Sequence, residues 1–170
     1  KEEGYILKIG GYEVVDLGDD VYTQGKPHPM IDPEVRIKKI LECAKDPQTG
    51  VILLDCMLGY GCHPDMAGAL APAIREAQEI AKADGRELYF VASVCGTRQD
   101  PQDYDRAVAE LKECGVLVEE SNARAIRLAL KLKGIDYKEN TRGHVEAAVD
   151  ETPLPEPDEK IMELLNTKPR

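Results

Sequence analysis

Tryptophan is absent from this 170-residue chain, phenylalanine occurs once and histidine only three times. Basic residues are also scarce, because 22 lysines and arginines stand against 32 acidic residues and give a formal charge of −10. Nucleic acids and anionic membranes bind positively charged surfaces, so this balance argues against both as partners. No apolar run has the length of a membrane-spanning helix, and Lys1-Glu2-Glu3 does not resemble a secretory signal. We therefore expect a soluble, cytoplasmic protein.

Paired cysteine motifs are missing as well. The chain has five cysteines, an odd number, with neither a CxxC pair nor the spacing of a zinc site. We expect reduced thiols that pack as small apolar side chains. Cys62 and Cys95 differ from the others because each follows the predicted end of a strand, where a positive neighbour or a helix N-terminus would make a thiol reactive.

What the sequence does contain is an alternation of apolar, β-rich runs with amphipathic helical segments. This order predicts a doubly wound α/β fold with parallel strands and right-handed crossovers. The run Val51–Leu54 has no polar alternation, which is typical of a strand buried on both faces. Tyr5–Leu7 reads as an edge strand or an ordered lead-in. The predicted strands are 13–17, 51–54, 88–94 and 116–118, and the predicted helices begin at Asp32-Pro33, Pro64, Asp100-Pro101 and Ser121.

The composition changes after Gly134. Pro153, Pro155 and Pro157 and many charges follow, with one short helical pattern, and this segment is too poor in apolar residues to hold a core of its own. We predict a single domain over residues 1–134 and an extended tail or linker over 135–170.

A glycine-rich turn joins the strand at Val51 to the next helix. Gly59 and Gly61 allow a sharp turn and a close approach by a ligand, and Pro64 suits the first turn of a helix. A helix N-terminus reached from such a turn is a plausible anion site. Ligands of doubly wound sheets collect beyond the carboxyl ends of the strands, and three loops should meet there: 18–20, 59–63 and 95–98.

His63, at the end of the glycine turn, is the candidate catalytic residue. It could accept a phosphoryl group or act as a general acid or base, although the simpler interpretation, a polar residue at a helix start, is favoured. Asp19, Asp20 and Asp55 could hold a metal if their loops met, but solvated carboxylates at strand ends are common, so no metal site is predicted. Gly25-Lys26 lacks the spacing of a nucleotide-binding lysine loop.

Several segments together resemble a known family, the FdrA proteins, and more distantly the ligase-CoA domain of succinyl-CoA synthetases. The segments are Asp16-Leu17-Gly18-Asp19-Asp20, Gly25-Lys26-Pro27-His28-Pro29-Met30-Ile31-Asp32-Pro33, Ile52-Leu53-Leu54-Asp55, Leu58-Gly59-Tyr60-Gly61 and Gly96-Thr97.

The resemblance implies a three-layer α/β/α, flavodoxin-like domain with five parallel strands in the order 2-1-3-4-5. It also implies an acyl-CoA synthetase (NDP-forming)-like function with CoA, ATP or ADP, and Mg. The phosphohistidine loop of the succinyl-CoA synthetase α-subunit has no counterpart here, so catalysis is expected only with other domains or subunits. The predicted ligand-binding residues are Gly59, Tyr60, Gly61, Cys62, His63, Gly96, Thr97, Gly18 and Asp19.

In this alignment the strand at 13–17 corresponds to the second strand of the family, so the first βα unit is missing. The missing strand would lie in the middle of the sheet, and unpaired backbone there is costly. We expect an upstream segment, another chain or rearranged N-terminal residues to fill the position; a homo-oligomer is also possible.

Two other functions remain open. The resemblance also admits a subunit of an oxamate carbamoyltransferase complex in allantoin degradation, which would bring carbamoyl phosphate to the same anion site. From a different class, a non-catalytic interaction module would recruit partners through an exposed sheet edge and the proline-rich tail.

Overall fold

A computed structural model describes residues 4–135 of the chain. The predicted tail beyond Ile135 lies outside the described residues.

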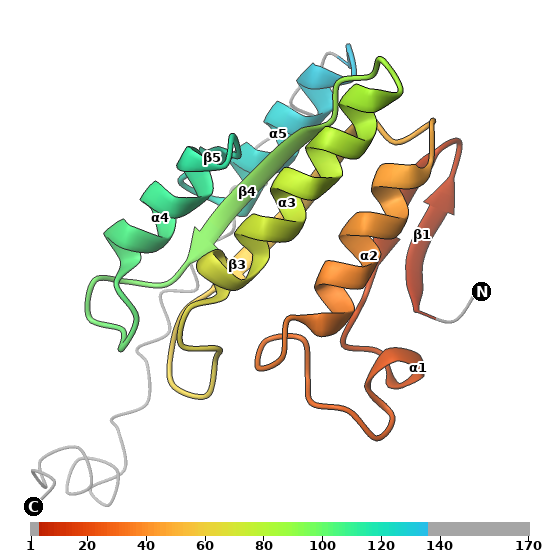
Figure 1. Ribbon diagram of the computed structural model, residues 1–170. Coiled ribbons are helices and arrows are strands. Elements are labelled where there is room, and N and C mark those ends of the chain that lie inside the picture. Colours follow the sequence, from red (N-terminus) through yellow and green to blue (C-terminus); the bar gives the residue numbers. More distant parts are fainter. Residues whose placement is uncertain (1–3, 136–170) are drawn as a thin grey trace, which may run out of the picture. The chain divides into compact units, whose positions relative to one another are not determined.

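Three parallel strands form the main sheet in the order β3-β4-β5 (Figure 1). Leu53 of β3 lies opposite Val91 of β4, which in turn lies opposite Leu117 of β5. Helices α2, α3 and α4 cover one face and α5 covers the other, so the predicted three-layer α/β/α fold is confirmed. The bounds are β3 Val51–Met57, β4 Tyr89–Cys95, β5 Leu117–Glu119, α2 Glu34–Lys45, α3 Met66–Ala83, α4 Tyr104–Glu113 and α5 Asn122–Leu132.

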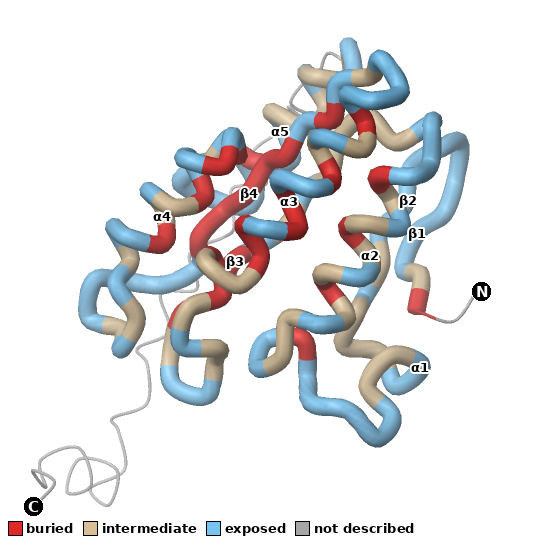
Figure 2. Tube along the Cα trace, viewed as in Figure 1, coloured by how far each residue is buried: buried red, intermediate tan, exposed pale blue. Residues whose placement is uncertain are grey.

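The core lies between β4 and helix α3. Phe90, the one phenylalanine, is fully buried in β4 and packs with apolar side chains that recur at helical spacing in α3 (Figure 2). The fully or almost fully buried residues of α3 are Met66, Ala67, Leu70, Ala71, Ile74, Ala77 and Ala81. The helix runs without interruption through Pro72. Within the described residues, no helix is both long and apolar enough to cross a membrane.

Three of the helices that cover the sheet begin at residues whose side chains accept hydrogen bonds from the first turn. Asp65, Asp103 and Ser121 cap α3, α4 and α5 in this way. The predicted start at Asp100-Pro101 is wrong, because α4 begins at Tyr104. The carboxylate of Asp100 bonds instead to the backbone and hydroxyl of Thr97, and Asp103 takes over as the cap.

The N-terminal strands form a hairpin rather than part of the parallel sheet. β1 (Tyr5–Ile9) pairs antiparallel with β2 (Tyr12–Val15), which corrects the predicted strand at 13–17. The two residues between them, Gly10 and Gly11, have φ of 57° and 83°, and a two-residue hairpin turn with positive φ at both positions favours glycine. The pair Gly10-Gly11 was the signal that the sequence interpretation missed. A single-turn helix, α1 (Asp20–Thr23), follows the hairpin.

Strand β3 is paired on one side only. No strand of residues 4–135 lies against its other side, so the N-terminal residues described here do not fill the position predicted for a missing strand. The expectation that β3 is buried on both faces is also wrong: Cys56 is its one buried residue, and Leu53 is 39% exposed. Arg36 of α2, itself buried, donates to the backbone carbonyl of Asp55 near the end of the strand.

Candidate functional site

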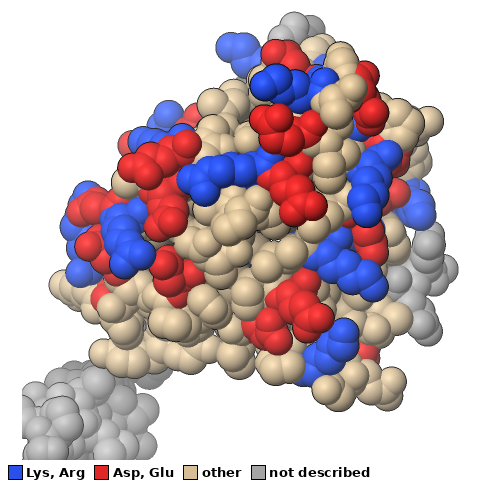
Figure 3. All heavy atoms as spheres, in the orientation of Figure 1, with Lys and Arg blue, Asp and Glu red and all other residues tan. Residues whose placement is uncertain are grey.

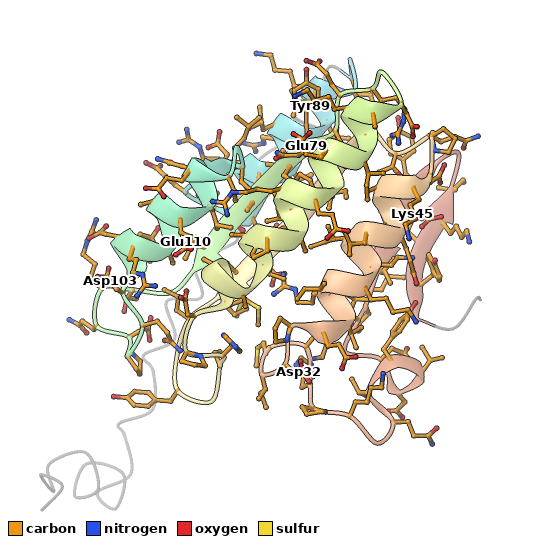
Figure 4. All side chains as sticks on the ribbon, in the orientation of Figure 1. Asp32, Lys45, Glu79, Tyr89, Asp103 and Glu110 are labelled. Atoms are coloured by element: carbon orange, nitrogen blue, oxygen red, sulfur yellow. The ribbon has the colours of Figure 1, made fainter. Side chains whose placement is uncertain are left out.

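The candidate site lies where β3 and β4 end. The N–H of Leu58 donates to the carbonyl of Cys95 over 2.9 Å, which extends the pairing of the two strands into the loops that follow them. Figure 4 shows Asp103 and Asp32 at this end of the molecule, where α4 and α2 begin, and Tyr89 at the opposite end, where β4 begins. Helix N-termini and strand C-termini therefore meet at one edge, as predicted.

The Gly59–His63 loop makes the sharp turn that its glycines suggested. Gly59 and Gly61 have φ of 135° and 82°, values that side chains disfavour, and the N–H of Cys62 closes the turn on the carbonyl of Gly59 over 3.3 Å. Tyr60 stands at the tip and is 91% exposed. No hydrogen bond within residues 4–135 engages the N–H of Tyr60 or of Gly61, so these two donors remain available.

Gln102, from the connection between β4 and α4, holds this loop in place. Its Oε1 accepts from the N–H of Gly59 over 2.9 Å, and its Nε2 donates to the carbonyls of Gly59 and His63 over 3.0 Å and 3.3 Å. The sequence interpretation missed Gln102, because nothing in a glutamine between a proline and a helix cap indicates a contact 43 residues away.

His63 makes two hydrogen bonds inside the protein. Its backbone N–H donates to the carbonyl of Met30 over 2.8 Å, and its ring Nδ1 accepts from the backbone N–H of Asp65 over 3.0 Å. An Nδ1 that accepts carries no proton, so the neutral ring carries its proton on Nε2. In this tautomer Nε2–H can donate a proton but has no free lone pair, so phosphorylation at Nε2 would first require loss of that proton.

A carboxylate already occupies the N-terminus of α3. Asp65 accepts from the N–H of Gly68 over 3.1 Å and from the guanidinium of Arg106 over 2.9 Å. An anion placed at this helix end would compete with that carboxylate for the same donors. A cavity of about 40 Å³, room for water-sized groups, lies beside it. The cavity is lined by Leu58, Pro64, Asp65, Met66, Ala67, Gln102, Asp103, Arg106 and Ala107.

The loop after β4 lies beside the glycine turn. A Cβ on Gly96 would come within 2.6 Å of the Cβ of Leu58, so this glycine permits the close packing of the two strand ends. The N–H of Thr97 donates to Asp100 over 2.5 Å. Gly96 and Thr97 are thus near the glycine turn as predicted, but the Thr97 amide already has an acceptor.

In the third predicted loop, residues 18–20, the described hydrogen bonds of Gly18 and Asp19 join residues close in sequence. Asp19 caps α1 by accepting from the N–H of Val21 over 3.1 Å, and the N–H of Gly18 donates to Asp16 over 2.9 Å. No described hydrogen bond joins Gly18 or Asp19 to the other two loops. Among residues 4–135 no three metal-ligating side chains come together, so Asp19, Asp20 and Asp55 do not form a metal site there.

Charged side chains at this edge are paired with one another, and the cysteines differ in their exposure. Arg98 donates twice to Asp105, over 2.8 Å each time, and these bonds lower the pKa of the Asp105 carboxyl. Cys62 is half-buried and Cys95 exposed, whereas burial raises the pKa of Cys56 to about 11. In Figure 3 charged side chains of both signs gather over the helical face, and some of both signs also reach the lower edge.

Comparison with known proteins identifies the kind of domain to which this edge belongs. The family model described as CoA-ligase matches residues 4–132, most of the chain and all the loops described above. The chain belongs to the CoA-ligase family. This CoA-ligase domain is also 44% identical over 115 residues to the uncharacterized protein YahF of Escherichia coli (strain K12). The match covers 68% of this chain and 22% of YahF, so the chain spans about a fifth of that relative's length.

Proposed function

We propose that this CoA-ligase domain is of the FdrA type and works as part of an acyl-CoA synthetase (NDP-forming)-like enzyme. It binds a phosphate-bearing ligand, such as CoA or ADP, at the carboxyl edge of the sheet. The observation that carries the proposal is the Gly59–His63 loop. This loop follows strand β3 of the CoA-ligase domain and holds two backbone donors, on Tyr60 and Gly61, that no described residue engages. Backbone N–H groups in such turns bind phosphate oxygens.

Catalysis requires residues from outside the described part of the chain. Arg98 and Arg106 are both paired with carboxylates, and the Nδ1 of His63 is occupied. The transfer of a phosphoryl group requires nearby cations and a correctly positioned acceptor group. We infer that other domains or subunits supply them, together with Mg when a nucleotide is bound.

The unpaired side of β3 supports a partner of a specific kind. Hydrogen bonds from Leu58 and to Gly50 point toward β4, so the backbone groups of Val51, Leu53 and Asp55 point the other way. Of these, the carbonyl of Asp55 already accepts from Arg36. We propose that an apolar extended segment of the same, longer protein pairs there as a parallel strand, between β3 and β2. The length of YahF leaves ample chain for such a segment.

Calorimetric titration with CoA, ADP, inorganic phosphate and carbamoyl phosphate tests ligand binding. Gly61→Val should abolish it, because a branched side chain disfavours φ of 82° and crowds the two free donors. Gly85→Val is the matched control: Gly85 has φ of 71°, an added Cβ likewise meets nothing within 4 Å, and it follows α3 at the opposite end.

The pattern of outcomes separates the functions. Binding of CoA or ADP by the wild type and Gly85→Val, but not by Gly61→Val, supports the proposal. Binding of carbamoyl phosphate alone favours the carbamoyltransferase alternative. No binding of any of the four ligands contradicts a ligand site in this domain and leaves the interaction module as the better description.

A further inference from the structure

The carboxamide of Gln102 contacts the Gly59–His63 loop as a peptide group would. It both accepts from and donates to the backbone of Gly59, the two-bond pairing that neighbouring strands use, and a third bond reaches His63 at the other end of the loop. Both ends of a five-residue turn are therefore held by one side chain. The residues between them, Tyr60 and Gly61, keep the free donors.

The part of the chain that carries Gln102 is itself fixed. Pro101, before it, has a restricted φ, and Asp103, after it, caps α4 by accepting from the N–H of Arg106 over 3.0 Å. The position of the loop is thus tied to the start of α4 as well as to its own helix, α3.

We propose that Gln102 is the positioning residue of the ligand loop: it fixes Gly59 and His63 so that the amides of Tyr60 and Gly61 present a preformed pair of donors. This role rests on the proposed function, because it has a purpose only if the loop binds a ligand. The role requires glutamine. Glutamate cannot donate to the two carbonyls, and asparagine is one methylene shorter.

Hydrogen exchange without ligand tests the positioning itself. Gln102→Ala removes the acceptor of the Gly59 amide, so its exchange should accelerate by about tenfold or more, given typical hydrogen-bond energies. The amide of Val91, in the core strand, should not change. Gln99→Ala is the matched control, since Gln99 is exposed in the same connection and its side chain makes no described hydrogen bond. Unchanged exchange at Gly59 in Gln102→Ala would overturn the proposal, whether or not any ligand binds.

Binding of CoA and of inorganic phosphate supplies the second test. Gln102→Ala should weaken the affinity of whichever of the two binds by about tenfold, because the donors lose their fixed arrangement. Gln102→Glu should weaken it at least as much, and Gln99→Ala should bind as the wild type does. If the wild type binds and Gln102→Ala binds equally well, Gln102 is not a positioning residue, although the proposed function stands. If the wild type binds neither of these probes and does not bind ADP in the titration above, the proposed function fails, and the exchange of Gly59 alone decides what Gln102 does.

Discussion

Strands β3 and β4 are neighbours of equal length and similar apolar character, yet their surroundings differ. β4 pairs with a strand on each side, and five consecutive residues from Phe90 to Val94 are buried. β3 pairs with β4 alone, buries only Cys56 and exposes more than a third of Leu53. An apolar run therefore shows that a segment is suited to the inside of a sheet, but the neighbours that the sheet supplies decide whether it is buried.

Helix α3 and the N-terminal hairpin show a similar contrast. The apolar face of α3 is buried in the core with β4. The hairpin of β1 and β2, in contrast, exposes Ile6, Ile9 and Val14 (Figure 2). A hairpin with exposed apolar side chains is typical of a surface that becomes an interface. The comparison thus separates strand β4, which is paired on both sides and buried, from strand β3, which has one described partner and is partly exposed.

The largest expected difference comes from truncating one residue in each strand. Phe90→Ala should lower the free energy of unfolding by about 3–5 kcal/mol, because Phe90 is fully buried. Leu53→Ala should cost less than about 1 kcal/mol in the same chain, since much of that side chain is already in water. Urea denaturation followed by circular dichroism measures both. Equal losses would mean that β3 is covered in solution.

The second prediction concerns Cys56, the one residue of β3 that is as buried as β4. Burial raises its pKa from 9.0 to about 11, so folding favours the protonated thiol. The contribution of the protonated Cys56 thiol to the free energy of unfolding is complete below pH 9 and is lost as the pH rises from about 9 towards 11. Two pKa units correspond to roughly 2–3 kcal/mol. The free energy of unfolding should fall across this range, and less steeply in Cys56→Ala; an equal slope in both proteins would contradict the assignment.

Much of this architecture follows from local sequence. The helical spacing of Leu70, Ile74 and Ala81 and the β-rich run at Phe90 predicted α3, β4 and their packing, because each pattern reports a buried face directly. The start of α4 was wrong because two aspartates, Asp100 and Asp103, compete for one cap, and only the fold shows which of them faces Thr97.

The site was predictable in outline and not in detail. Gly59 and Gly61 indicated a turn at the carboxyl edge because glycine at such spacing has few other uses. Which amides stay free depends on partners far along the chain, such as Gln102 for Gly59 and Met30 for His63. Such contacts leave no periodic pattern, so sequence alone cannot identify them.

The third prediction compares the glycines that follow the two strands. Gly96→Ala, after β4, places a Cβ 2.6 Å from that of Leu58 and should destabilise the domain by about 1–3 kcal/mol through overpacking. Gly61→Ala, after β3, meets no atom within 4 Å and should cost about 1 kcal/mol for its positive φ alone. Thermal unfolding of the two variants checks the order. A larger loss in Gly61→Ala would show that the loop after β3 is the more tightly packed.

The smallest change in stability is expected from Leu53→Lys, which nonetheless probes the comparison most directly. A lysine in place of the exposed Leu53 should alter the free energy of unfolding of the isolated chain by no more than about 0.5 kcal/mol, as surface substitutions do.

The amide of Leu53 should exchange much faster than that of Ala92, because only Ala92 lies in a strand paired on both sides. If the proposed strand is added in a longer form of the protein, it should protect Leu53, and Leu53→Lys should weaken that protection by placing a charge in an apolar interface. A Leu53 amide as slow as Ala92 in the isolated chain would mean that the edge is already covered. A fast one in the longer protein would mean that no strand is added there.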